Sequence, residues 1–155
     1  QPKKTSESSV SKISAQSKQK VLYGEQAVKN GRLDNRVKGV HSAKILDHPD
    51  FSVETLKTNP DGTIDVKFTK QLPNGNASKL KASTLFPKSW DEDKIFDAAK
   101  SVGNTRPIAT SVSGKTLHRG TIDGVKMDVM KQGDDVIAAF PCGNKPTLID
   151  EFRNQ

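Results

Sequence analysis

Apolar side chains are sparse at the start of the chain and recur regularly after it. Residues 1–20 contain only Val10, Ile13 and Ala15 as apolar positions, too few to offset the entropy that is lost when a chain becomes ordered. Val10, Ile13 and Val21 nevertheless fall near helical spacing. The pattern predicts a polar linker over residues 1–20, with a short amphipathic helix against the body as the alternative.

Turn signals divide residues 39–86 into extended segments. The clearest signal is Asn59-Pro60-Asp61-Gly62, where proline fixes φ and glycine accepts a positive φ, as a hairpin turn requires. Pro49 disfavours helix at the residue before it, and Pro73-Asn74-Gly75-Asn76 marks another reversal. The strands that we predict for this meander are 39–47, 51–58, 63–70 and 78–86.

One amphipathic helix interrupts the strands. Ser89 and Glu92 have the spacing of a capping box, apolar residues follow at intervals of three and four, and Gly103 ends the helix. Further strands are predicted at 108–112, 115–122, 125–130 and 136–140, separated by the dipeptides Ser113-Gly114, Asp123-Gly124 and Gln132-Gly133.

These elements predict an α+β protein in three parts. Residues 1–20 are the polar linker or N-terminal helix. Residues 21–86 form an N-terminal subdomain that carries the candidate catalytic residues. Residues 87–155 form a C-terminal subdomain of one helix and an antiparallel sheet.

The positive charge is confined to the first half of the chain. Residues 1–81 contain 15 Lys and Arg against 8 Asp and Glu, whereas residues 82–155 contain 10 of each, which accounts for the net charge of +7. A one-sided basic surface attracts polyanions and releases their counterions. Nucleic acid or an acidic protein is therefore the favoured partner, although many inert domains are equally basic.

Two classes of protein are disfavoured by composition. Cys142 is the single cysteine, which excludes an internal disulfide and every multi-cysteine metal site. No stretch approaches the roughly 20 apolar residues of a membrane span, and the N-terminus does not resemble a signal peptide. We expect a protein without a membrane span that can work in a reducing compartment.

The three histidines are the natural candidates for acid–base chemistry near neutral pH. His41 follows Gly39-Val40, where the backbone can pass close to a bound group, and functional and structural roles are equally supported. His48 lies in an Asp-His-Pro-Asp turn, which favours a solvated turn histidine. His118 lies within a predicted strand, which favours a cross-strand or surface role.

Lysine and hydroxyl groups share one face of the predicted strand 78–86. Lys79, Lys81 and Ser83 alternate along it, with Thr84 on the opposite face or at its end. Cleavage of an RNA phosphodiester needs a base for the 2′-hydroxyl, an acid for the leaving 5′-oxygen and a cation for the phosphoryl oxygens. Taken alone, two such lysines usually face solvent.

Neither a metal site nor a thiol nucleophile is expected. The acidic cluster at 91–97 occupies the first turns of a predicted helix, where the helix dipole accounts for it. Cys142 has no histidine beside it in sequence, and no glycine-rich phosphate loop is present. We therefore expect no cofactor.

Several segments, taken in order, resemble the bacterial EndoU-type ribonuclease domain of secreted and contact-dependent inhibition toxins. Residues 81–90, KASTLFPKSW, resemble its Lys-then-Ser-Thr-aromatic-Phe-Pro-x-x-Trp signature. Residues 120–129 and 139–141 resemble its later strands and terminal aromatic-proline, and LYGE at 22–25 and GVHS at 39–42 resemble its two histidine-bearing segments. The resemblance covers about residues 20–141.

The resemblance implies two small antiparallel sheets with helices on their outer sides and a central cleft. It also implies metal-independent transesterification to a 2′,3′-cyclic phosphate by two histidines and a lysine, of which His41 and Lys81 match. Lys20 stands where the family's first histidine usually stands. The second acid–base group is therefore His48, Lys20 or a residue elsewhere.

The resemblance also implies substrate contacts and partners. Phe140 replaces a tyrosine that stacks on uracil in relatives, and Ser83 or Thr84 would contact the base, so we expect weaker selectivity for uridine. The expected substrate is structured RNA, above all transfer RNA, in the cytoplasm of a target bacterium.

We expect delivery as the C-terminus of a larger secreted or cell-surface protein, with an acidic immunity protein as the partner of an otherwise monomeric domain. The alternative, suggested by Lys20, is a non-catalytic RNA-binding or adaptor domain on the same scaffold.

Overall fold

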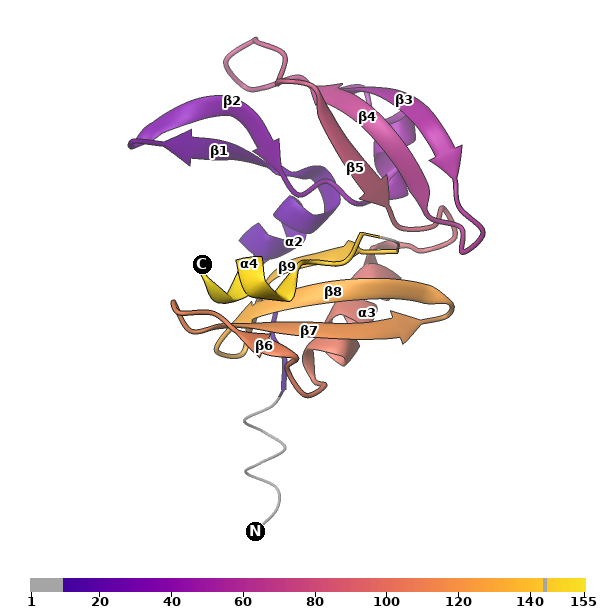
Figure 1. The fold of residues 1–155 in the computed structure, drawn as a ribbon. Helices are drawn as coiled ribbons and strands as arrows, with labels where there is room; N and C mark the ends of the chain where they lie inside the picture. The colour runs from indigo at the N-terminus through magenta and orange to yellow at the C-terminus, as the bar shows by residue number, and fades with distance from the viewer. Residues whose placement is uncertain (1–9, 144) are drawn as a thin grey trace.

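The computed structural model describes residues 10–143 and 145–155 and has an α+β fold. Three antiparallel sheets and three α-helices are present in this part of the chain, which confirms the predicted class, although the sheets number three rather than two. The two-stranded and three-stranded sheets form one half of the molecule, and the four-stranded sheet with α3 and α4 forms the other (Figure 1). No described helix has the length and apolar character needed to cross a membrane.

The N-terminal segment includes a helix and a hairpin. Residues 1–9 of the predicted linker lie outside the described residues, and Ala15–Tyr23 forms α2, with Val21 and Leu22 buried. The two strands that follow, β1 (Glu25–Lys29) and β2 (Arg32–Lys38), were not predicted. Asn30 and Gly31 join them with φ values of 54° and 77°, the conformation in which Asn-Gly favours a two-residue hairpin turn.

The next sheet follows the predicted meander except at its start. A 3-10 helix, η1, occupies Ala43–Asp47, so the strand predicted over 39–47 is wrong. Gly39 and Val40 both have positive φ, which ends any extended run, and the Ser42 side chain accepts from Lys44 N and starts the helical turn. The three strands are β3 (Phe51–Thr58), β4 (Ile64–Lys70) and β5 (Lys81–Leu85), in the order β3-β4-β5.

The C-terminal half matches its prediction closely. The helix α3 begins later than the capping box implied, because Asp91 rather than Ser89 caps it by accepting from Lys94 N. The strands lie in sequence order, and the short helix α4 was not predicted. The elements are α3 (Glu92–Gly103), β6 (Ala109–Thr110), β7 (Lys115–Ile122), β8 (Val125–Gln132), β9 (Asp135–Pro141) and α4 (Ile149–Arg153).

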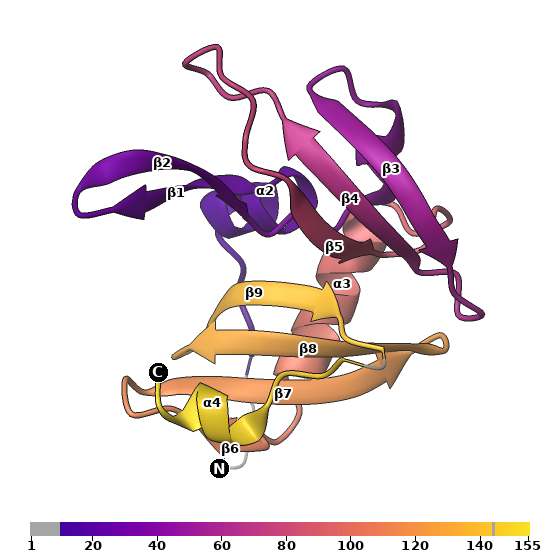
Figure 2. The ribbon, with the colours of Figure 1, turned by 45° about the horizontal axis from the view of Figure 1, so that its top comes forward.

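The two halves have separate cores that meet along α2, β5 and β9. One core packs α2 and α3 against β8 and β9, and the other lies beneath β3, β4 and β5. Tyr23 packs against both, and Phe86, directly after β5, stacks on Trp90 with ring centroids 5.3 Å apart. The views in Figures 1 and 2 agree in placing the end of β5 close to β9. This junction holds the candidate site.

A close backbone contact fixes the link from β2 into the junction. The Gly39 Cα lies so near α2 that a Cβ there would come within 2.1 Å of the Lys20 carbonyl oxygen. Val40, which is fully buried, has φ of 73°, a conformation that costs an L-residue about 1–2 kcal/mol. Surrounding contacts must therefore hold this link in place.

We expect Gly39→Ala to lower the free energy of unfolding by at least about 3 kcal/mol, because the added methyl group meets backbone that cannot move aside. Gly31→Ala is the matched control: Gly31 also has positive φ, but nothing lies within 4 Å of the point that a Cβ would occupy there, so a decrease of only about 1 kcal/mol is expected. Urea denaturation of both variants measures the difference. Equal decreases would show that the contact with α2 is unimportant.

Candidate active site

The candidate site is built where four segments meet: the end of α2, the link 39–41, strand β5 and strand β9. The link pairs with α2 through its backbone. Val40 N donates to Lys20 O at 3.1 Å and His41 N donates to Val21 O at 2.8 Å. On the other side, Phe86 N donates to His41 O at 2.8 Å. The position of His41 is therefore determined by both halves of the molecule.

The His41 imidazole is half-buried and oriented by a single strong contact. Its Nδ1 lies 2.9 Å from the Thr84 carbonyl oxygen, and the ring packs against Phe140 at 5.7 Å and Phe86 at 6.5 Å between centroids. A carbonyl oxygen can only accept, so Nδ1 carries the proton and donates it. In the neutral ring, Nε2 is consequently left with its lone pair and is the nitrogen that can accept a proton.

Lys81 and Ser83 hold the strained link from β5. Lys81 Nζ donates to Gly39 O at 3.0 Å, and the Ser83 hydroxyl donates to Val40 O at 2.7 Å and lies 3.3 Å from His41 Nδ1. Both side chains thus project from the same face of β5, as the alternation predicted. Lys79 lies two residues before the start of the strand and lines a surface pocket beside β2. Lys81 therefore lies against the link that leads to His41, and the catalytic roles of both residues stay predictions.

Lys20 reaches the same place from the last turn of α2. Its Nζ donates to Ile137 O of β9 at 2.8 Å, while its backbone carbonyl receives Val40 N. Its charge acts on both His41 and Lys81. The structure therefore brings Lys20 beside the two matched residues.

The three groups share a desolvated and positively charged environment. Burial is the largest cause of a pKa of about 4 for His41, the charges of Lys81 and Lys20 also lower this pKa, and the hydrogen bond to Thr84 O opposes the shift. Burial also lowers the pKa of Lys20 and of Lys81 from their ordinary value. Neighbouring lysines add to each shift, and the charge of Glu25 opposes the shift at Lys20. Near neutral pH this combination gives a neutral imidazole next to two ammonium groups that release a proton more readily than usual.

His48 lies in a different cluster. Its ring packs against Tyr23 at 5.4 Å and Phe51 at 5.3 Å, and its Nδ1 accepts from Asp50 N at 3.1 Å. Within residues 10–143 and 145–155 it forms no hydrogen bond or ring contact with His41, Lys81 or Lys20. The structure does not bring this candidate into the site, because η1 turns the chain away after Ser42.

The three residues predicted to contact substrate are all at the junction but differ in availability. Phe140 lies against His41 and is half-buried. The Ser83 hydroxyl is bonded to Val40 O, and the Thr84 hydroxyl donates to Asp65 Oδ1 at 2.8 Å. Each hydroxyl proton is therefore already used within the protein.

The other histidine and the cysteine have structural surroundings that do not favour catalysis. His118 is buried, with Nδ1 at 2.8 Å from Thr105 O and Nε2 at 2.8 Å from the Thr116 hydroxyl. Burial raises the pKa of the Cys142 thiol to about 11, which makes it a poor nucleophile. No cluster of three or more metal-ligating side chains occurs in the part of the chain that the structure describes.

Comparison with known families gives a match over most of the chain. A family model described as bacterial EndoU nuclease matches residues 14–143, which include α2, the link 39–41, β5 and β9. No curated protein and no solved structure matches the chain.

We expect His41 to weaken the fold in acid. Because its pKa is about 4 when folded and 6.5 when unperturbed, the unfolded state binds more protons between these values, and stability falls as the pH drops through that window. Between about pH 7 and about pH 4.5, the parent should lose about 2 kcal/mol more of its unfolding free energy than His41→Gln loses.

Urea denaturation at the two pH values measures this difference. Groups common to both proteins, such as Asp128, whose pKa is lowered by its bonds to Arg119 and Thr147 despite burial, cancel in the comparison. Parallel decreases in the two proteins would contradict the assignment of a neutral, desolvated imidazole.

Proposed function

The chain belongs to the bacterial EndoU nuclease family and is an endoribonuclease, and from this premise we propose that it cleaves RNA without a metal ion, by attack of a 2′-hydroxyl on the adjacent phosphate. The 2′-oxygen forms a bond to phosphorus and the bond to the 5′-oxygen breaks. The products are a 2′,3′-cyclic phosphate and a 5′-hydroxyl end. The observation that carries the proposal is the convergence of His41, Lys81 and Lys20 at one junction.

His41 is the general base. Its Nε2 has the lone pair, since Nδ1–H is donated to Thr84 O, and it accepts the proton of the attacking 2′-hydroxyl. The low pKa of the ring keeps it neutral at working pH, so the base is present in its active form. The rings of Phe140 and Phe86 restrict its rotation.

Lys81 stabilises the phosphoryl oxygens. Negative charge grows on these oxygens as the 2′-oxygen attacks, and a desolvated ammonium stabilises such charge more strongly than one in water. Its hydrogen bond to Gly39 O holds the ammonium against the link, two residues before His41. Two of its three protons remain for the phosphate.

Lys20 is the general acid, in preference to His48. The leaving 5′-oxygen requires a proton, and an ammonium with a lowered pKa gives one up more easily than an exposed lysine. Lys20 lies beside His41 and Lys81, whereas His48 packs against Tyr23 and Phe51. After the reaction, exchange with water returns the His41 proton to solvent and reprotonates Lys20.

The family also suggests a biological role for the protein. We propose a toxin domain that is delivered as the C-terminus of a larger secreted or cell-surface protein, acts on transfer RNA in the cytoplasm of a target bacterium and is a monomer except in complex with an acidic immunity protein. The excess of basic residues in the first half of the chain supports both an RNA substrate and an acidic inhibitor. Phe140 would stack on the base, with Ser83 and Thr84 near it, giving weak uridine selectivity.

The first test is cleavage in a chelator. Purified protein in EDTA should degrade total RNA to fragments that end in a 2′,3′-cyclic phosphate, and His41→Ala should lower kcat/KM about 10³-fold. Intact RNA at micromolar enzyme would remove the catalytic proposal. RNA binding by the parent without any cleavage would instead support a binding or adaptor domain.

The second test separates Lys20 from His48. A substrate with sulfur in place of the 5′-bridging oxygen has a leaving group that needs little protonation. Lys20→Gln should lower kcat/KM on ordinary RNA about 10²-fold or more but should cleave the sulfur substrate nearly as well as the parent. His41→Ala should be impaired on both substrates, because its role precedes the departure of the leaving group.

His48→Gln is the matched control. It should resemble the parent on both substrates. If His48→Gln shows the selective rescue and Lys20→Gln does not, the roles proposed for these two residues are wrong.

A further inference from the structure

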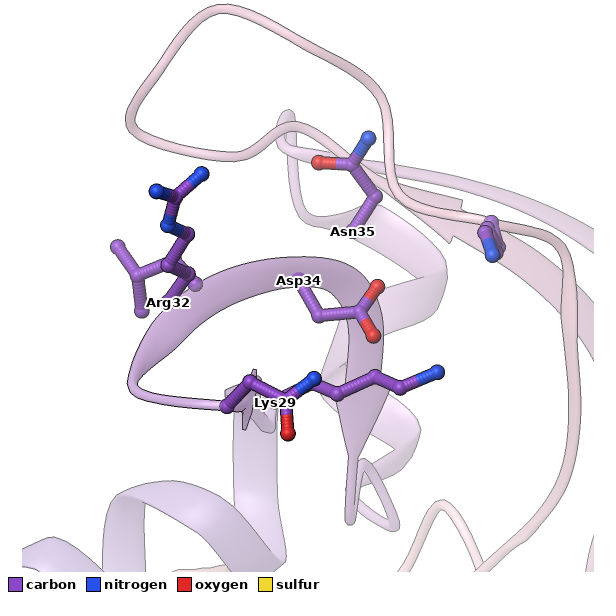
Figure 3. A pocket seen from close by; sticks show the side chains of 7 residues that line it. Lys29, Arg32, Asp34 and Asn35 are labelled. Carbon is purple, nitrogen blue, oxygen red and sulfur yellow. The ribbon is translucent and has the colours of Figure 1, made fainter.

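The β1–β2 hairpin and the loop before β5 line an open pocket of about 670 Å³, which takes no part in the reaction proposed above. Figure 3 shows side chains from both strands directed around it. Lys79 N donates to Asn35 O at 2.8 Å, which fastens the loop to the hairpin. The pocket, which we term the hairpin groove, is lined by Lys29, Asn30, Arg32, Leu33, Asp34, Asn35 and Lys79.

The groove has an excess of unpaired positive charge. Lys29 and Arg32 are directly opposite each other in the register of the hairpin, where like charges repel and destabilise the strand pair. Among the described residues neither they nor Lys79 forms an ion pair, and all three are exposed. The one carboxylate, Asp34, is held by Arg36 at 2.9 Å. An anion bound between the basic side chains would relieve the repulsion.

The polar groups of the groove suit phosphate better than a protein surface. The side-chain amides of Asn30 and Asn35 have no hydrogen-bond partner within residues 10–143 and 145–155, so they are available to phosphate or ribose oxygens. Leu33 is the single apolar lining residue, and no aromatic ring is present among the described lining residues to stack on a base or anchor a protein partner. Such a lining contacts a nucleic-acid backbone without reading its sequence.

Two short chain segments join the groove to residues of the candidate site. Lys79 precedes Lys81 by two residues, a rise of roughly 7 Å in extended chain. Asn35 precedes Gly39 by four residues, a rise of roughly 13 Å. A single strand with its scissile phosphate beside His41 and Lys81 would place a neighbouring part of its backbone over the hairpin.

We propose that the hairpin groove is a second RNA-binding site, which holds sugar-phosphate backbone a few nucleotides from the scissile bond. This inference rests on the proposed function for the identity of the polyanion. The groove supplies affinity for long RNA and contributes little to the reaction of a substrate too short to reach it.

The test compares Lys29→Gln/Arg32→Gln/Lys79→Gln with the control Lys57→Gln/Lys126→Gln/Lys145→Gln. The control removes the same charge at exposed positions outside the groove. The ratio of kcat/KM for a transcript of tRNA length to that for a dinucleotide should fall at least tenfold in the groove variant and less than about threefold in the control, because exposed charges far from the bound strand are screened.

Salt dependence provides the second readout. The slope of log affinity against log salt for an uncleavable RNA of the same length, measured by fluorescence anisotropy, should become shallower by about 0.7 for each phosphate that the variant no longer neutralises. The binding assay does not require catalysis, so it tests the groove even if the parent cleaves nothing, in which case only the proposed function fails.

Three results would overturn the inference. They are an unchanged ratio and slope, equal decreases in kcat/KM on the transcript and the dinucleotide, and unchanged RNA binding accompanied by weaker binding to an acidic protein. The last would make the groove a protein interface. Circular dichroism and melting temperature check folding, which should persist because removal of opposed like charges does not weaken the hairpin.

Discussion

The docking of Gly39 and Val40 onto the end of α2 is the contact on which the candidate site depends. The Lys20 carbonyl receives Val40 N, and only a glycine fits at position 39 against it. The left-handed backbone at Val40 is unfavourable by itself and persists because hydrogen bonds from β5 and to α2 hold the link on both sides. The same bonds fix the backbone from which His41 projects, and the contact of Nδ1 with Thr84 O then orients the imidazole.

The second organising feature is positive charge that the protein does not neutralise. Lys20 and Lys81 bond to backbone carbonyls rather than to carboxylates, and their charges favour the neutral form of His41. The hairpin groove repeats this arrangement on an exposed surface, where Lys29 and Arg32 face each other. A polyanionic ligand relieves the repulsion in both places at once. Binding at the groove and reaction at the site would therefore depend on one continuous strand of substrate.

Local signals predicted the regular parts of the fold well. The turn at 59–62, the helix ending at Gly103 and the strands of the C-terminal half follow from short-range rules of glycine, proline and spacing. The strand predicted over 39–47 failed because the conformation there is determined by contacts with α2 and β5, which alternation cannot reveal. The β1–β2 hairpin does have a local signal, the Asn30-Gly31 dipeptide at its turn, but its strands lack a regular alternation of apolar residues.

The amino-acid sequence by itself determined the α+β class and the family, and it singled out His41 and Lys81 as candidates, because those depend on local patterns and on motifs within short segments. Only the tertiary structure decided between Lys20 and His48 as neighbours of His41. His48 is seven residues from His41, but the helical turn η1 separates the two in the chain. Lys20 is 21 residues away, and the hydrogen bonds between α2 and the link place it close to His41. Proximity at this junction is set by long-range hydrogen bonds and packing, which sequence separation does not encode.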